Sequence, residues 1–202
     1  MAGAPRPSGS WIGGYVHRWH EVCPPWLGYF LASPLRKLWQ DPHVILAPYV
    51  TAGMTVLEPG PAMGFFTLEL ARLVGPAGRI VAVDLQEPML AALRRRAARR
   101  GLQDRIETRR ATAEGMEIAD LAGRVDFALL FAMVHEVKDR GRFFADVAAA
   151  LKPGGRALLA EPRGHVSDDL FADLERLAAA SGLRVDGRPA VPSSRTAVLV
   201  KA

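Results

Sequence analysis

A run of small residues between a hydrophobic segment and an amphipathic one is the part of this chain best suited to bind a ligand. Glu58 ends the hydrophobic run MTVLE, and Gly60, Ala62 and Gly64 follow at alternate positions before a helical pattern begins. Small side chains let a ligand approach the backbone closely, and the exposed N–H groups at a helix start attract a carboxylate or a phosphate. The spacing predicts a site for an anionic or nucleoside-like molecule.

Two further residues narrow the choice of ligand. A dinucleotide-binding loop has the pattern G-x-G-x-x-G, but its last position here is Phe65, whose side chain would meet the pyrophosphate. Asp84 ends the hydrophobic run RIVAVD, 20 residues after Gly64, where a carboxylate can accept hydrogen bonds from both hydroxyls of a ribose. An adenosyl ligand is favoured, although a nicotinamide oxidoreductase stays open as a hypothesis because Asp84 suits both.

The loop has the G-x-A-x-G form of an acidic-x-G-x-G-x-G motif, and together with Asp84 it resembles the class I, Rossmann-like S-adenosylmethionine-dependent methyltransferase family, especially its small-molecule branch. The resemblance runs from about Met54 to Gly155 and implies S-adenosyl-L-methionine as the cofactor. Thr112 stands where the family usually has Asp, and Ala113 offers a backbone contact to adenine. The implied cofactor contacts are Glu58, Gly60, Ala62, Gly64, Asp84, Leu85, Thr112, Ala113 and Phe131.

A histidine after the fourth predicted strand is the candidate catalytic residue. The resemblance implies an activated methyl and a neutral leaving group, so the protein must chiefly hold the acceptor atom in line with the methyl, at roughly 3 to 3.5 Å. A base is required only where the acceptor loses a proton, and His135 is the first candidate for it. The alternative is a histidine that only forms hydrogen bonds in a loop at the sheet edge.

Three other polar residues are expected to contact the substrate. Glu136 follows the candidate base, and Glu161 and His165 follow the fifth predicted strand. Carboxyl ends of parallel strands line the ligand crevice in open α/β sheets. Alternatively, Glu161 only accepts hydrogen bonds from loop N–H groups, and His165 only caps or precedes the next helix.

The first forty residues hold two features of a different kind. His17, His20 and Cys23 recur every third residue and could gather metal or metalloid ligands on one helical face. Only three such ligands occur, without a C-x-x-C motif, so ordinary packing is favoured and no metal is expected. The aromatic stretch Trp26–Trp39 is expected to pack in the core, or else to cover an apolar acceptor or rest on a membrane surface.

The predicted acceptor is a small, apolar or aromatic molecule, for instance a quinone-like or lipid-like compound, because an aromatic cover suits it better than a long polymer. Two other functions stay open: a noncatalytic protein that binds an adenosyl ligand, and an RNA methyltransferase, suggested by the arginines between Arg94 and Arg110. No aromatic residues interleave with the arginines of the segment Leu93–Arg105 to stack on bases, so a solvated helix face is favoured there and no obligate nucleic-acid partner is expected.

A parallel sheet would bring these residues together. From residue 54 onward, short apolar or β-branched runs alternate with amphipathic stretches, as in βαβ units. The predicted fold is α/β: a Rossmann-like three-layer sandwich with a mostly parallel seven-stranded sheet that ends in an antiparallel hairpin. The predicted strands are Met54–Glu58, Arg79–Asp84, Arg105–Arg109, Val125–Phe131, Arg156–Glu161, Leu183–Gly187 and Thr196–Ala202.

Cap residues mark helices outside this alternation. Ser33 and Asp41 each precede a proline, which predicts two short helices before the sheet, and Ser167 predicts a helix up to about Ala180. We expect three parts: a disordered terminus (1–10), a helical N-terminal cover (11–50) and a methyltransferase domain (51–202).

Composition limits the fold and the location that we expect for this chain. The chain has 202 residues, half of them hydrophobic, which is enough to bury a core without disulfides or metals. Cys23 is the single cysteine, and no apolar run approaches the roughly 20 residues that cross a bilayer. The first thirty residues lack the pattern of a signal peptide, so we expect a cytoplasmic protein; the sequence does not indicate its oligomeric state.

Overall fold

The computed structural model describes residues 40–112 and 115–202. These residues form a sheet of seven strands in the order β3-β2-β1-β4-β5-β7-β6. The first five strands along the chain are parallel, whereas β7 runs antiparallel to both β5 and β6. The predicted α/β fold with its terminal antiparallel hairpin is confirmed. The strands are β1 Thr55–Pro59, β2 Arg79–Asp84, β3 Ile106–Arg110, β4 Val125–Phe131, β5 Leu151–Pro162, β6 Leu183–Gly187 and β7 Ser194–Lys201.

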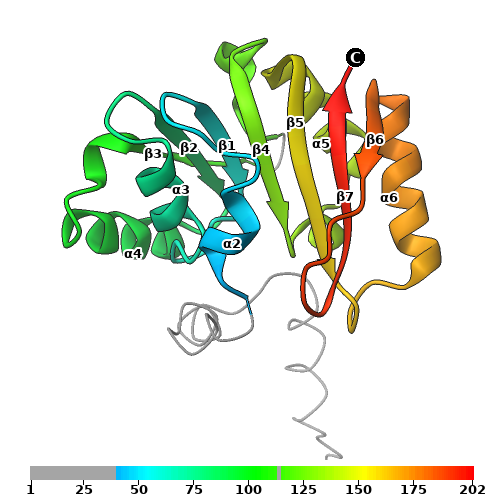
Figure 1. Ribbon diagram of the computed structural model, residues 1–202, viewed down its shortest axis with the longest axis horizontal. Coiled ribbons are helices and arrows are strands. Elements are labelled where there is room, and N and C mark those ends of the chain that lie inside the picture. Colours follow the sequence, from blue (N-terminus) through cyan, green and yellow to red (C-terminus); the bar gives the residue numbers. More distant parts are fainter. Residues whose placement is uncertain (1–39, 113–114) are drawn as a thin grey trace, which may run out of the picture.

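Helices cover both faces of the sheet and give the fold its three layers (Figure 1). Successive residues of a strand point to opposite faces, so Val56 joins an apolar cluster with α2, α3 and α4, while Leu57 joins another with α5 and α6. None of the described helices is long and apolar enough to cross a membrane. The helices are α2 Pro42–Leu46, α3 Thr67–Leu73, α4 Glu87–Ala98, α5 Arg140–Ala150 and α6 Asp168–Ala180, with short 3₁₀ turns η3 Gln103–Arg105, η4 Ala119–Leu121 and η5 Val134–Glu136.

Two of the predicted helix caps fall on described residues, and both are confirmed. The side chain of Asp41 accepts a hydrogen bond from the N–H of His43 at 2.9 Å, and that of Ser167 accepts one from Leu170 at 3.1 Å. The helix expected after Ser33, the terminus 1–10 and residues 11–39 of the helical cover lie outside the described residues. So do His17, His20, Cys23 and the stretch Trp26–Trp39.

The fifth strand begins earlier than the sequence predicts. β5 starts at Leu151, whereas the predicted strand starts at Arg156, so the segment KPGG lies inside the strand. The pairing with β4 shifts from Val125 opposite Leu151 to Phe127 opposite Arg156, which makes this segment a bulge. Gly154 has a φ of +73°, which glycine adopts without strain.

The carboxyl ends of the parallel strands meet at one edge of the sheet, the lower edge in Figure 1. Glu58, Asp84, Phe131 and Glu161 each lie at or within one residue of the end of their strand. The topology therefore brings together site residues that are more than a hundred positions apart in the chain.

Candidate functional site

The loop between β1 and α3 has a backbone that requires small residues. Gly60 and Gly64 have φ values of +66° and +85°. A Cβ atom at Gly60 would lie 3.1 Å from the Cβ of Met133, and one at Gly64 would lie 2.4 Å from a methyl carbon of Leu93. Ala62 has a φ of +47°, a conformation that costs a residue with a side chain about 1–2 kcal/mol. Packing from two sides thus fixes the loop.

One arginine of α4 supports this loop. The guanidinium of Arg96 donates a hydrogen bond to the carbonyl oxygen of Met63. The side chain is half-buried, and its burial lowers the pKa of Arg96. The sequence predicted a solvated face for the arginines of this helix, Arg96 included. The spacing from Leu93 could have indicated the contact, because Arg96 lies three residues after Leu93, on the helix face that packs against the loop.

Glu58 places a buried carboxylate at the start of the loop. Its side chain is almost fully buried, and both its Oε2 and the Oγ1 of Thr67 lack a hydrogen-bond partner among the described residues. Burial raises the pKa of Glu58 to about 8; the nearby Thr67 hydroxyl opposes the rise and the charge of Asp84 adds to it. A buried carboxylate without a partner is unfavourable unless a proton or a cationic group joins it. This end of the loop therefore fits a ligand with an ammonium group.

Asp84 lies close to the same loop, at the end of β2. Its Oδ1 accepts a hydrogen bond from the N–H of Gln86 at 2.8 Å. Burial raises the pKa of Asp84; the N–H groups of Gln86, Ala62 and Leu85 oppose the rise, and the charge of Glu136 adds to it. Leu85 is 53% exposed, which is unusual for a large apolar residue in this structure. A carboxylate next to an exposed apolar side chain suits a ligand in which hydroxyl groups adjoin a flat ring.

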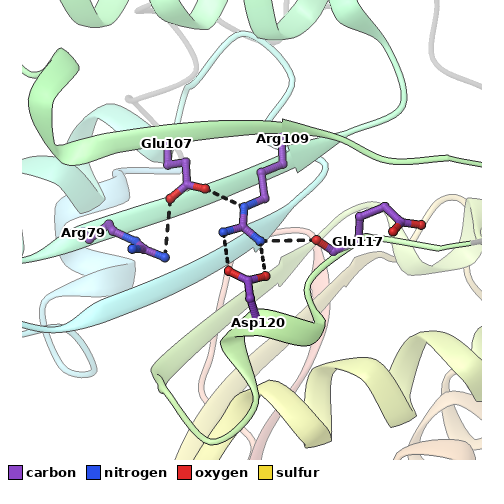
Figure 2. Close-up of polar contacts among 5 residues, drawn as sticks. All are labelled: Arg79, Glu107, Arg109, Glu117 and Asp120. Carbon is purple, nitrogen blue, oxygen red and sulfur yellow. Dashed lines mark hydrogen bonds and ion pairs between the residues drawn. The ribbon is translucent and has the colours of Figure 1, made fainter.

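An arginine on β3 fixes the segment that follows this strand. Arg109 binds both oxygens of Asp120 at 2.6 and 2.8 Å and Glu107 at 2.6 Å, and it donates to the carbonyl oxygen of Glu117 at 3.3 Å (Figure 2). Glu107 also pairs with Arg79 at 3.4 Å. Because Asp120 lies in η4, these contacts tie the chain between β3 and η4 to the strand. Sequence reasoning did not identify this network.

The predicted adenine contacts lie in this segment. The N–H of Thr112 donates to the carbonyl oxygen of Gly115 at 3.0 Å, and its hydroxyl donates to Glu117 at 3.3 Å. Ala113 lies outside the described residues, so its backbone contact with adenine stays a prediction.

His135, in the turn η5 after β4, and Glu161, near the end of the adjacent strand β5, form a hydrogen-bonded pair. The Nδ1 of His135 lies 2.5 Å from the Oε2 of Glu161, and the Oε1 accepts the N–H of Val134 at 2.8 Å. Glu161 is fully buried. The hydrogen bond to Glu161 raises the pKa of His135 above its ordinary value; burial opposes the rise, the charges of Glu161 and Glu136 add to it, and Arg140 opposes it. The sequence predicted both residues as site residues but not their pairing.

The other predicted substrate contacts lie close to His135. Glu136 is exposed, with its Oε1 3.9 Å from the Nε2 of His135. His165 is also exposed, and its ring lies edge-on to that of His135 with 5.8 Å between the centroids. Phe131, which was predicted as a cofactor contact, is buried against Phe66, with 4.3 Å between the ring centroids. Across residues 40–112 and 115–202, no three His, Cys, Asp or Glu side chains are grouped to hold a metal ion.

Comparison with known proteins identifies the family. A family model described as a methyltransferase domain matches residues 56–155, from β1 to the bulge of β5. The chain belongs to the class I S-adenosylmethionine-dependent methyltransferase family. Family and fold together imply S-adenosyl-L-methionine as the cofactor. The buried Oε2 of Glu58, which lacks a hydrogen-bond partner among the described residues, fits the ammonium group of that molecule.

Individual methyltransferases agree with this assignment. The chain is 29% identical over 131 residues to a ubiquinone/menaquinone biosynthesis C-methyltransferase, UbiE, of a Marinomonas species, covering 65% of this chain and 51% of that protein. It is 32% identical, with the same coverage, to the protein of that name from Hahella chejuensis. The chain thus spans about half the length of the curated relatives it matches. Among solved structures, an S-adenosylmethionine-dependent methyltransferase from Aquifex aeolicus has a TM-score of 0.77 at 22% identity, covering 88% of this chain and 97% of that one.

Proposed function

We propose that this chain is an enzyme that transfers a methyl group from S-adenosyl-L-methionine to a small, apolar or aromatic acceptor by in-line displacement. The observation that carries the proposal is the buried carboxylate of Glu58, whose Oε2 has no hydrogen-bond partner among the described residues, at the start of a glycine loop that also contacts Asp84 through the N–H of Ala62. The first suits an ammonium group and the second suits ribose hydroxyls. A nucleoside that carries an amino acid supplies both.

Each cofactor-site residue has a role in this proposal. Glu58 binds the ammonium group, and Asp84 accepts hydrogen bonds from the ribose. The backbone of the loop lies along the amino-acid part of the cofactor, which Arg96 supports indirectly by holding the carbonyl of Met63. The residues that remain, Leu85, Thr112, Ala113 and Phe131, are assigned to the surroundings of the adenosyl group.

The acceptor side uses the residues beyond β4 and β5. The cofactor supplies a methyl group on a sulfonium, so the residues of this chain need only orient the acceptor and handle its proton. His135 is assigned as the base, and Glu136 and His165 are assigned to contact the acceptor because both adjoin the imidazole of His135.

The names of the relatives support an apolar or aromatic acceptor. They name C-methyltransferases of ubiquinone and menaquinone biosynthesis, which favours a quinone-like acceptor and methylation at carbon.

The other functions considered have less support. Several arginines of the basic segment are engaged within the protein, since Arg94 binds Glu87 and Thr108 and Arg105 binds the carbonyl of Ala71. This pairing weakens the case for an RNA substrate. A noncatalytic adenosyl-binding protein is distinguished from an enzyme only by turnover. The cytoplasmic location, the peripheral membrane contact through Trp26–Trp39 and the three-part division of the chain stay predictions.

Calorimetric titration with S-adenosylmethionine, S-adenosylhomocysteine and NAD tests the cofactor. We expect both adenosyl ligands to bind, and Asp84→Ala to weaken binding by about tenfold or more, the effect of losing a charged hydrogen-bond partner. Asp104→Ala, which removes an exposed acid from η3, is the matched control and should bind as the wild type does. Absence of adenosyl binding, or binding of NAD instead, would overturn the proposal.

Formation of S-adenosylhomocysteine with a panel of hydroquinones and phenols then tests the reaction. Product with any of them supports a small-molecule methyltransferase. Cofactor binding without product across the panel would favour the noncatalytic alternative, and product only with RNA, together with steeply salt-dependent binding, would favour an RNA methyltransferase.

A further inference from the structure

We propose that Glu161 is a positioning residue that holds the proton of His135 on Nδ1, so that Nε2 accepts a proton from the acceptor. The inference concerns a residue expected to contact substrate, and it narrows the acceptors to those whose methylated atom carries an acidic proton, such as a phenolic hydroxyl or an activated ring carbon. This substrate class rests on the proposed function. The state of the imidazole does not, and it can be measured without a known acceptor.

The hydrogen bonds of Glu161 favour this proton arrangement. Its Oε1 accepts the N–H of Val134 at 2.8 Å, and its Oε2 lies 2.5 Å from the Nδ1 of His135. An ionised carboxylate can only accept hydrogen bonds, so Nδ1 must be the donor. Because Glu161 is fully buried, both of its oxygens are used to hold these two consecutive residues and water does not compete for them.

The imidazole is held from other sides as well. Arg140 donates to the carbonyl oxygens of His135 at 2.8 Å and of Val134 at 3.3 Å, which fixes the backbone that carries the ring. The ring of His165 lies against it edge-on. The second ring nitrogen, Nε2, has no hydrogen bond among the described residues, because the nearest carboxylate oxygen, from Glu136, is 3.9 Å away. Nε2 is therefore the nitrogen that can receive a proton.

The charged groups that face His135 set its basicity. The hydrogen bond to Glu161 on β5 raises the pKa of His135 most strongly, Glu136 on η5 also raises it, and burial and Arg140 on α5 lower it, leaving a pKa above the ordinary value. His165, from the segment after β5, is the other titratable group in contact. Proton acceptance should therefore be lost as the pH falls through a value above about 6.5.

The proposed step moves one proton from the acceptor to Nε2 of His135. The O–H or C–H bond of the acceptor breaks, its electron pair stays on the acceptor atom, and a new N–H bond forms at Nε2. The imidazolium that results lies against the carboxylate of Glu161, which stabilises its charge, and it returns the proton to water after the acceptor leaves.

Glu161→Gln distinguishes positioning from a merely structural role. The amide is nearly the same size, and its oxygen can still accept the N–H of Val134. Its NH₂ group then faces Nδ1 of His135 and donates to it, so the ring proton must move to Nε2. The variant should fold and bind cofactor normally but present a protonated nitrogen to the acceptor.

Nitrogen-15 NMR of histidine-labelled, full-length protein measures the tautomer and the pKa directly, and His135→Gln assigns the signal. We expect the Nδ1–H tautomer in the wild type, and in Glu161→Gln the Nε2–H tautomer with a lower pKa. Glu69→Gln is the matched control, because Glu69 lies 3.0 Å from Nδ1 of the exposed His43 and should leave the His135 signal unchanged. The Nε2–H tautomer in the wild type, or an unchanged tautomer in Glu161→Gln, would overturn the proposal.

Kinetics with an active acceptor add a second readout. Glu161→Gln and His135→Gln should each lower kcat by about 100-fold, and the double variant should be little worse than either one, because the two side chains act as one base. Calorimetry with S-adenosylmethionine tests the proposed function separately from the role of Glu161. If the wild type does not bind S-adenosylmethionine, the proposed function is overturned, while the tautomer measured by NMR still decides whether Glu161 is a positioning residue.

Discussion

The buried carboxylate of Glu58 makes folding and ligand binding depend on pH, and Glu58→Gln should remove that dependence. A glutamate in the unfolded chain has its ordinary pKa of 4.5, whereas burial raises the pKa of Glu58 to about 8 in the folded protein. Between these values the folded protein retains a proton that the unfolded chain has lost. The free energy of unfolding therefore falls as the pH rises from about 4.5 to about 8, and levels off above that.

The size of the effect follows from the two pKa values. Their difference of about 3.5 units corresponds to roughly 5 kcal/mol over the whole range, of which about 3 kcal/mol falls between pH ~5.5 and ~8.5. Urea unfolding at these two pH values measures it. The wild type should lose about 3 kcal/mol more between them than Glu58→Gln, in which every other titrating group is unchanged.

Binding of S-adenosylmethionine should release the proton that Glu58 carries in the folded protein. At pH ~7 about 0.9 of the unliganded molecules carry a proton on Glu58, and an ammonium group at the carboxylate would displace it. Calorimetric titration with S-adenosylmethionine in buffers of different ionisation enthalpy counts the protons released. We expect about 0.9 at pH ~7 and none from this group in Glu58→Gln. If the wild type releases no proton at neutral pH, Glu58 does not bind the ammonium group.

Three further substitutions test the supports of the site. Gly64→Ala presses a Cβ against a side-chain methyl at 2.4 Å, so we expect unfolding to become easier by about 1–3 kcal/mol and cofactor affinity to fall, as read by urea unfolding and calorimetry. Gly53→Ala has the same φ of +85° but open space around it, and should leave the affinity unchanged. Arg96→Met removes the hydrogen bond to the loop carbonyl and should weaken cofactor binding about tenfold without unfolding the protein, which circular dichroism would check. Asp120→Asn breaks the two-point pair with Arg109 and should raise the KM for cofactor while kcat changes little; an equal fall in kcat would contradict a positioning role.

Most of the fold could be predicted because each strand is a short apolar run with clear ends. The start of β5 could not, because the KPGG segment is typical of a turn and becomes a bulge only through pairing on both sides of it with β4. That pairing depends on a strand 20 or more residues earlier, and no local pattern specifies it. The carboxyl ends of the strands are thus easier to predict than an irregularity near the start of a strand.

The same distinction applies to the site. Glu58 and Asp84 could be identified from their places at strand ends, since parallel strands bring such positions to one edge. The pairing of His135 with Glu161 could not, because these residues are 26 positions apart and meet only where η5 turns back over β5. The contacts of Arg109 could not be predicted either, because its partner Asp120 lies in η4, 11 positions further along the chain.

The segment that follows β4 connects the two halves of the site. Met133 packs against Gly60, so closely that a Cβ at the glycine would lie 3.1 Å from it, while the next two residues, Val134 and His135, bind Glu161. Three consecutive residues thus contact the cofactor loop on one side and the end of β5 on the other. A change in the loop that displaces Met133 must also move the backbone of His135, whose ring Glu161 holds by a short hydrogen bond. The order β1-β4-β5 in the sheet places the glycine loop and the His135–Glu161 pair on either side of this one segment, so the position of the proposed base depends on the packing of the glycine loop.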